Sequence, residues 1–301
     1  MFQSPVIEVR ENHCTRHNVG LSPTTEPMPY HEVVFASRGL WCRHQGARSW
    51  PVDSRHVHFF AQGSVHRVSH PAGCGDRNTG LAVSADALEE ITRGINPERT
   101  PRSPYAHTHR RVDARLAAAH GLLRRVAQQG ADALAVEELS LRLVVRALGT
   151  SSCRDASSPR PPTASERIQV EQARALLHHD LSGPLSVSDV AAAVGLSAFH
   201  LSRVFSRVIG TPMMRYRGEL RLADAIQRVL TGDAALADVA ASSGFADRSH
   251  LTRSVRRALG GSPAALRAAL GDARWEALAR RWLDVERAES KQVHARARSA
   301  G

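Results

Sequence analysis

Polar and apolar residues repeat with helical spacing in the C-terminal half of the chain, and the same pattern occurs there twice. Within residues 185–266, Asp189 and Asp238 each open a short helix, and these helices end at Gly195 and Gly244. Glycine adopts the left-handed conformation that a sharp helix end requires, and a second helical pattern follows each of them. The repeat therefore predicts two helix–turn–helix units.

The second helix of each unit is expected to have one apolar and one polar face. Ser197 and Asp247 stand where an N-cap residue is needed. With Leu201 and Leu251 at the centres of the buried stripes, a step of about 100° per residue turns hydroxyl and arginine side chains outward in both units. The outward residues are Phe199, Ser202, Arg203, Ser206 and Arg207 in the first unit, and Arg248, Ser249, Thr252, Arg253, Arg256 and Arg257 in the second.

Hydroxyl and guanidinium groups donate hydrogen bonds to phosphates and to guanine edges, so these two faces predict contact with double-stranded DNA. One such helix alone is equally typical of a solvated amphipathic surface. Two units that agree in turn glycine, cap and helical phase favour the DNA-contacting interpretation.

Between the units, Pro212 to Thr231 has apolar residues at helical spacings, and Gly232 closes the stretch. A helix of about 18 residues is roughly 27 Å long. That length is close to the roughly 34 Å of one turn of B-DNA, so two recognition helices joined in this way can enter successive major grooves. A plain connecting helix in an all-α domain, the alternative, requires no particular length.

Several short motifs now carry a family resemblance. They are Gly195-Leu196-Ser197, Tyr216 followed by Arg221-Leu222, Gly244-Phe245, Ser249-His250, and the Gly-x-Ser-Pro of Gly260 to Pro263. Together they resemble the AraC/XylS family of bacterial transcription regulators over roughly residues 165–270. The resemblance implies a sequence-specific DNA-binding regulator in which the outward residues above contact DNA. RNA polymerase is an expected partner, activation of transcription is the expected effect, and repression is the alternative. Leu251 and Val255 are smaller than the family's usual residues and indicate a lighter core under the second recognition helix.

The N-terminal part has a different pattern. Short apolar runs at 32–35, 40–42, 57–60 and 80–83 are separated by turn residues. Such closely spaced runs predict an antiparallel barrel or sandwich. The resemblance implies a cupin-like barrel, and the segment from Phe59 to His66 is similar to the strand–turn–strand signature of that domain. The expected fold class is therefore α+β, a small antiparallel β-barrel with flanking helices followed by an all-α double helix–turn–helix domain.

Residues 108–149 return to helical periodicity. The resemblance implies helices that pair two subunits of a homodimer, and the alternative is that they pack on the barrel of their own chain. Thr150 to Ser165 is rich in serine and proline and is typical of an exposed linker.

The expected domains follow from these patterns. They are a sensing and dimerisation domain at 1–149, a linker at 150–165, a DNA-binding domain at 166–270, and a further helix with a disordered tail at 271–301. Ile168, Ala175, Leu176 and Leu177 are expected on the inner side of the first DNA-binding-domain helix, and Trp275, Leu278, Trp282 and Val285 on that of the added helix.

Composition agrees with a nucleic-acid partner. The formal net charge is +11 with a sequence pI near 10.8. Because Lys291 is the only lysine, part of this charge reflects a general arginine preference. No apolar run approaches the roughly 18 residues of a membrane span, and Met1 to Cys14 lacks a signal-peptide pattern, so we expect a cytoplasmic protein with no membrane partner.

The interior of the barrel is the expected place for a small-molecule effector. Trp41 and Arg43 share one strand face and offer an aromatic wall and an anion partner, and His31 and His66 can add polar contacts. A barrel filled by its own side chains is the alternative.

A metal or redox function is the other interpretation of this region. His56, His58, His66 and His70 suggest metal ligands, but no second set with a carboxylate stands at a suitable spacing, so neither a metal nor a cofactor is expected. Cys14, Cys42, Cys74 and Cys153 form no C-x-x-C pair, which favours reduced thiols over a zinc site or disulfides, with Cys42 and Cys74 as the candidates for a redox sensor. A metal-dependent cupin-type enzyme remains the rival function, and since no complete catalytic constellation is present, we expect no enzymatic activity.

Overall fold

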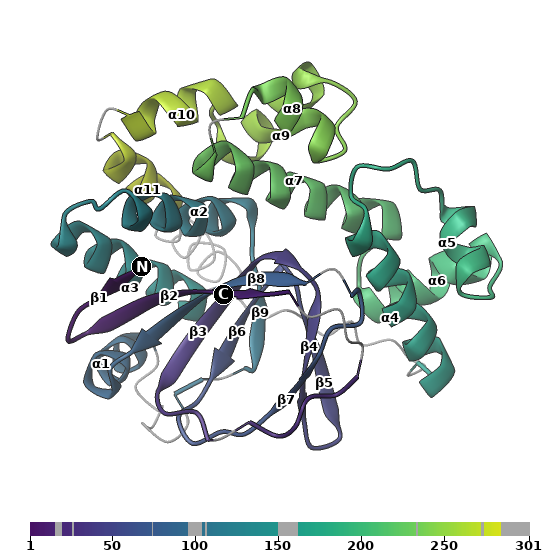
Figure 1. Cartoon of the computed structure of the whole chain (residues 1–301), viewed down its shortest axis with the longest axis horizontal. Helices are drawn as coiled ribbons and strands as arrows, with labels where there is room; N and C mark the ends of the chain where they lie inside the picture. The colour runs from purple at the N-terminus through teal and green to yellow at the C-terminus, as the bar shows by residue number, and fades with distance from the viewer. Residues whose placement is uncertain are drawn as a thin grey trace, which may run out of the picture.

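A computed structural model describes residues 1–15, 20–25, 27–73, 75–95, 104–105, 107–149, 162–232, 234–271 and 274–283. The strands lie at the lower side of the molecule in Figure 1, and helices of the C-terminal part cover them from above and from the right. The chain therefore has a β-rich N-terminal part and an all-α C-terminal part, and the predicted α+β class is confirmed.

The strands form two antiparallel sheets. Six strands in the order β1-β2-β8-β3-β6-β9 make the larger sheet, and β5-β4-β7 make the smaller one. Their bounds are β1 Phe2–Gln3, β2 Ile7–Cys14, β3 His31–Gly39, β4 Trp41–Gln45, β5 Arg48–Val52, β6 His56–Phe60, β7 Arg67–Ser69, β8 Asp76–Val83 and β9 His109–Arg111.

The chain crosses between the sheets at Gly39. This glycine has φ +85°, and a Cβ atom there would lie 2.2 Å from the carbonyl oxygen of Gly75. The register of β3 against β8 shifts between Ala36 and Arg38, and only Leu40 separates β3 from β4. A strand bent by such an irregularity can leave one sheet and join another. Among the described strands the result is two facing sheets, so the expected barrel is not closed.

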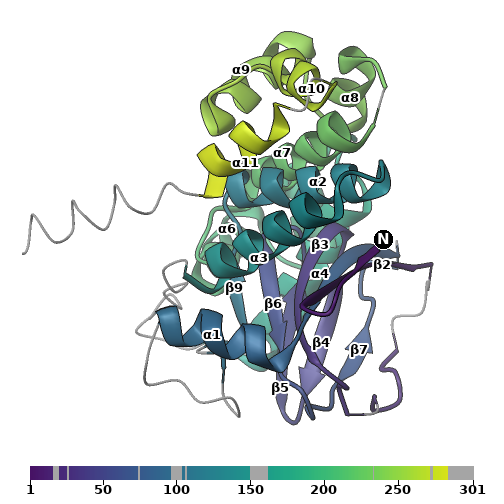
Figure 2. The same cartoon turned by 90° about the vertical axis from the view of Figure 1, so that its left-hand side faces the viewer.

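Three helices belong to the N-terminal part: α1 Ala85–Ile95, α2 Ala114–Gln128 and α3 Ala133–Gly149. Helical structure begins at Ala114 rather than at 108, because His109–Arg111 pairs with β6 as strand β9. Asp113 caps α2 by accepting a hydrogen bond from the backbone N–H of Leu116 at 2.7 Å. Figure 2 shows α2 and α3 between the sheet and the C-terminal helices.

The C-terminal helices are α4 Ala164–His179, α5 Val187–Ala193, α6 Ala198–Ile209, α7 Met213–Thr231, α8 Leu236–Ser242, α9 Arg248–Leu259, α10 Pro263–Gly271 and α11 Trp275–Leu283. The expected inner side of α4 is partly wrong. Leu177 is buried, but Ile168 is 60% exposed and Leu176 36% exposed. The buried side of α4 instead carries Val170, Ala173 and the charged residue Arg174.

The hydrophobic cores do not follow the expected division of the chain. The first helix–turn–helix unit has its own core, which includes Val190, Leu201, Phe205 and Tyr216. The second unit contributes Leu251, Val255 and Leu259 to a core that also holds Leu122 and other residues of α2, α3 and the larger sheet. Residues of the N-terminal part therefore fill the space that the small residues Leu251 and Val255 of α9 leave under the second recognition helix. The domain boundaries themselves stay a prediction.

Helix α11 confirms the expected added helix over Trp275–Leu283 and packs against α2 and α3. Trp282 is fully buried. Val285 and the expected disordered tail lie outside the described residues. In the part of the chain that the structure describes, every helix is too short or too polar to cross a bilayer.

Replacing Trp282 with alanine should lower the free energy of unfolding by about 3–5 kcal/mol, because the substitution leaves a large cavity in the shared core. Urea denaturation followed by circular dichroism measures this change. Glu276→Ala on the exposed side of the same helix should change it by less than about 0.5 kcal/mol. Equal midpoints for Trp282→Ala and the unaltered chain would show that α11 does not dock on α2 and α3.

Candidate nucleic-acid interface

Local hydrogen bonds position the first recognition helix, α6. Ser186 and Asp189 form a capping box at the start of α5, in which each side chain accepts from the other residue's backbone N–H. Gly195 has φ +70°, the left-handed conformation that the turn requires. Ser197 then caps α6 by accepting from the backbone N–H of His200 at 3.2 Å. The predicted turn and cap of the first unit are confirmed.

The second recognition helix, α9, begins in the same way. Gly244 has φ +75°, and a Cβ there would lie 2.4 Å from the carbonyl oxygen of Leu181, so only glycine fits this turn. The Asp247 side chain accepts from the backbone N–H of His250 at 2.6 Å. Helix α7 runs between the two units, from Pro212 at its N-cap to Gly232 at its C-cap, as predicted.

The outward face of α6 is largely open to solvent. Phe199 is 73% exposed, and the guanidinium of Arg203 lies 5.6 Å from the centre of its ring. Ser202 and Ser206 are half-buried. Arg207 is also half-buried, and its guanidinium forms an ion pair with Glu166 of α4. Phe199 and Arg203 are therefore the most accessible of the predicted DNA contacts in the first unit.

The outward face of α9 is more strongly basic. Arg248, Ser249, Arg253, Arg256 and Arg257 are all exposed. Thr252 is half-buried, and its hydroxyl donates to the backbone carbonyl of Arg248 at 2.8 Å. The structure thus leaves both predicted faces at the surface, and contact of these residues with DNA stays a prediction.

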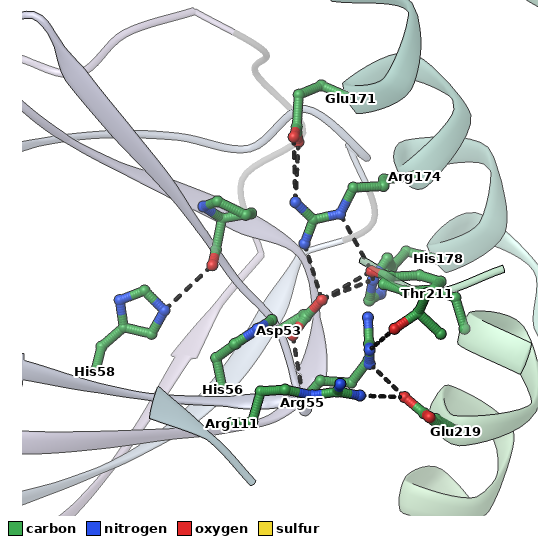
Figure 3. Close-up of polar contacts among 12 residues, drawn as sticks. Asp53, Arg55, His56, His58, Arg111, Glu171, Arg174, His178, Thr211 and Glu219 are labelled. Atoms are coloured by element: carbon green, nitrogen blue, oxygen red, sulfur yellow. Dashed lines mark hydrogen bonds and ion pairs between the residues drawn. The ribbon is translucent and has the colours of Figure 1, made fainter. Parts of the chain in front are cut away.

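A buried carboxylate joins the two parts of the chain. Asp53, in the turn between β5 and β6, is fully buried, and its Oδ2 accepts from Arg174 Nη2 at 2.9 Å and from the Tyr216 hydroxyl at 2.7 Å. His178 Nε2 lies 2.8 Å from the same hydroxyl oxygen, and His56 Nδ1 lies 2.8 Å from Asp53 Oδ1. Figure 3 shows Asp53 between its own strand turn and the side chains of α4 and α7.

The surroundings keep Asp53 ionised. Burial alone raises the pKa of a carboxyl group, but His56, the His178 ring, whose Nε2 lies 3.6 Å from Oδ2, and the Arg174 guanidinium outweigh this and hold the pKa of Asp53 well below its usual range. Burial likewise works against the charge on Arg174, yet Glu171, Tyr216 and Asp53 raise the pKa of Arg174 well above its ordinary value. The junction is therefore a compensated ion pair out of contact with water.

A second group of charges extends the junction along α7. Glu219 Oε2 accepts from Arg55 Nε at 2.8 Å and from Arg111 Nη2 at 2.9 Å, and its other oxygen accepts from Arg215 at 3.2 Å. Arg55 also donates to the Thr211 hydroxyl at 3.3 Å. A groove of about 480 Å³ lies over these ion pairs, between α2 and α7.

The sequence interpretation missed Asp53, Arg174 and Glu219. A usable signal exists for Arg174, because it lies in helical phase with Val170 and Leu177 on the apolar side of α4. A charge at such a position indicates a buried partner.

The structure brings together three of the four predicted effector residues. Trp41, Arg43 and His66 surround the ring of Phe60 between the two sheets. The ring centre of Phe60 lies 6.4 Å from that of Trp41 and 5.0 Å from that of His66, and the guanidinium carbon of Arg43 lies 4.1 Å from it. Arg43 donates to the backbone carbonyl of Phe59 at 2.8 Å, and burial lowers its pKa to about 10. His31 instead shares the opposite face of β3 with Val33 and contacts Tyr105.

Two of the histidines first considered as metal ligands, His56 and His58, have other contacts. His56 faces Asp53, as described above, and His58 Nε2 lies 3.1 Å from the carbonyl oxygen of Pro51. His58 is fully buried, and burial holds its pKa well below the usual value, so it is neutral. The rings of His56, His58 and His109 contact one another.

Comparison with known proteins assigns the C-terminal region to a class. A family model described as a helix-turn-helix domain matches residues 190–269, which span α5 to α10. Residues 190–269 are therefore a DNA-binding helix-turn-helix domain. The resemblance of this region to the AraC/XylS family, expected from the sequence, is confirmed.

Two curated relatives are transcriptional activators. The chain is similar to the transcriptional activator NphR from Rhodococcus sp., with 33% identity over 129 residues, 43% of this chain and 36% of that protein. It is also similar to the HTH-type transcriptional activator AarP from Providencia stuartii, with 28% identity over 88 residues, 29% of this chain and 65% of that protein. The chain thus spans less than two thirds of the length of each.

The chain is also similar to the solved structure of a transcriptional regulator from Chromobacterium violaceum that is described as containing an AraC-type DNA-binding domain. The two chains have 27% identity and a TM-score of 0.33, and the alignment covers 36% of this chain and 98% of that one.

Replacing Asp53 with asparagine should lower the free energy of unfolding by about 3–5 kcal/mol, because it leaves the buried Arg174 charge without its partner. Chemical denaturation at neutral pH measures the difference. Asp86→Asn, at an exposed position of α1, is the matched control and should change the free energy by less than about 0.5 kcal/mol. The same midpoint for both variants would mean that the Asp53 ion pair does not hold the junction.

The loss of unfolding free energy in Asp53→Asn should also depend on pH. Since the pKa of Asp53 is depressed in the folded chain, its contribution is complete above the unfolded pKa of about 3.9 and is lost as the pH falls toward the folded pKa. Plots of unfolding free energy against pH for the unaltered chain and for Asp53→Asn should therefore run parallel at neutral pH and converge in acid. A difference between the two chains that stays constant down to the pH of acid unfolding would contradict the depressed pKa of Asp53.

Proposed function

We propose that this protein is a sequence-specific transcription regulator whose helices α6 and α9 enter successive major grooves on one side of a DNA duplex. The observation that carries the proposal is the repeated exposed face of arginines and hydroxyl-bearing residues on α6 and α9. Phosphate contacts supply most of the affinity in such complexes, and base-edge contacts supply the discrimination.

The N-terminal part is proposed to control DNA binding in response to an effector. The Asp53 junction supports this, because it links the turn before β6 to helices α4 and α7 of the DNA-binding domain. Trp41, Arg43 and His66 remain the candidates for effector contact between the sheets. His31 lies on the other face of β3 and is the weakest of the four.

Activation through RNA polymerase and assembly as a homodimer complete the proposal. Of the two helices expected to pair subunits, α2 is covered within its own chain by α7, α9 and α11, so among the described residues α3 is the one of the two that a second copy can reach. There Leu134 is 72% exposed and Val145 43% exposed. The helix-turn-helix domain supports a role as a regulator rather than as an enzyme. The absence of catalytic activity stays a prediction.

Arg203→Ala or Arg253→Ala should weaken binding to the specific operator by about 1–3 kcal/mol if the arginine contacts a guanine. Fluorescence anisotropy on promoter DNA and on scrambled DNA of equal length measures this loss. An arginine that contacts only phosphate should instead weaken binding to both DNAs equally and lower the salt dependence.

Arg280→Ala serves as the control, because it removes an exposed arginine of α11 that lies outside both recognition helices. It should leave affinity for the operator unchanged. The interface assignment fails if Arg203→Ala and Arg253→Ala bind every DNA as tightly as the Arg280→Ala chain does.

A further inference from the structure

Three strand ends meet at the edge of the N-terminal sheets and bring together three metal-ligating side chains. Cys14 is the last residue of β2 and stands opposite Asp76, the first residue of β8. His70 follows β7 directly. The ligand atoms of Cys14, His70 and Asp76 all lie within 4.8 Å of one another, and among the described residues they form the group suited to a metal ion.

Close backbone contacts fix the position of these side chains. Gly75 has φ +68°, and a Cβ there would lie 2.5 Å from the carbonyl oxygen of Cys14. The Gly39 corner described above presses against Gly75 from the other side. Two glycines are thus needed where the ends of β2, β3 and β8 converge, and their replacement would push Cys14 and Asp76 apart.

A chain of hydrogen bonds orients the Asp76 carboxylate. The indole N–H of Trp41 donates to Asn78 Oδ1 at 3.0 Å, and the amide of Asn78 donates to Asp76 Oδ1. The other oxygen, Oδ2, is thereby turned toward His70, whose Nε2 lies 2.9 Å away. Outer hydrogen bonds of this kind orient the ligands of protein metal sites.

The burial of the three residues suits a site that exchanges its ion. His70 and Asp76 are each 6% exposed, whereas Cys14 is half-buried. An ion can therefore reach the group from the side of Cys14.

From this geometry we propose that Cys14, His70 and Asp76 bind a divalent zinc-class ion, with a water molecule as fourth ligand. Thiolate, imidazole and carboxylate are the ligands that Zn²⁺ takes in tetrahedral sites, and a thiolate disfavours Mg²⁺ and Ca²⁺. The ion replaces the thiol proton of Cys14, which passes to solvent, and is bound by an imidazole lone pair of His70 and by the Asp76 carboxylate. The charges of the thiolate and the carboxylate balance that of the ion.

The site lies beside the DNA-binding domain. Gly39 and Gly75 line one side of a cavity of about 130 Å³, and Leu181, Asp224 and Arg228 of the helical domain line the other. An ion that draws Cys14 and Asp76 together acts on the turn that faces this cavity. Regulation of DNA affinity by the ion follows, and this consequence rests on the proposed function, whereas the metal site does not.

Co²⁺ titration of the full chain tests the site directly. The chain is purified without a His tag, reduced, stripped with a chelator and titrated with Co²⁺, after which Zn²⁺ competes for the site. We expect one equivalent to bind, with a thiolate-to-cobalt charge-transfer band that Zn²⁺ removes. Failure of the folded, unaltered chain to bind one equivalent overturns the proposal.

Variants separate the ligands from their neighbours. Cys14→Ser should abolish the charge-transfer band, and Asn78→Ala should weaken Zn²⁺ binding by about 10–100-fold while the band persists, because Asn78 only orients Asp76. Cys42→Ser and His44→Gln are matched controls and should bind as the unaltered chain does. Loss of the band in Cys42→Ser or in Cys74→Ser, with normal binding in Cys14→Ser, overturns the assignment of Cys14.

DNA binding supplies a separate readout. On promoter DNA, Zn²⁺ should change the affinity of the unaltered chain at least about threefold and leave that of Cys14→Ser unchanged. An equal response of both chains overturns the regulatory consequence, even if the Co²⁺ titration succeeds. Normal Co²⁺ binding by a chain that binds no promoter DNA would contradict the proposed function and leave the metal site standing.

Discussion

The arrangement of this molecule depends on the buried carboxylate of Asp53. It is the point at which a strand turn of the N-terminal part contacts α4 and α7 together, through Arg174 and Tyr216. Placing two charges and a phenol out of water is favourable only when each finds its partner, so these contacts tolerate little change in geometry. The first helix–turn–helix unit is held against the N-terminal part by this specific polar contact and by the neighbouring Glu219 ion pairs.

The second unit is attached in another way. Leu251, Val255 and Leu259 on the inner side of α9 share one apolar core with α2, and α11 closes that core with Trp282. Apolar packing is less directional than hydrogen bonding and follows the area removed from water. The small residues of α9, which indicate a light core in the sequence, are explained by the N-terminal helix that fills the remaining space.

The sequence predicted those features that repeat along the chain and depend on neighbouring residues. Both turn glycines, both N-caps and the length of α7 are local, and each was correctly predicted. Strand β2 was missed although Ile7 and Val9 alternate with polar residues, and without β2 the pairing of Cys14 with Asp76 is invisible. Arg174 and Asp53 lie 121 positions apart, so no local pattern joins them. Ile168 and Leu176 were placed inside because a long-range ion pair, rather than apolar residues alone, sets the inner side of α4.

The two modes of attachment bear on how a signal can reach the DNA-binding faces. A shift of the turn that carries Asp53 changes hydrogen bonds at α4 and α7 directly, since their donors and acceptors need distances near 3 Å. The same shift reaches α9 only through a close-packed core, which transmits a displacement but does not release the helix. A shift of this turn would therefore displace the first recognition helix relative to the second. In the proposed function α6 and α9 enter successive grooves together, so a change in their relative position would alter affinity without altering either face.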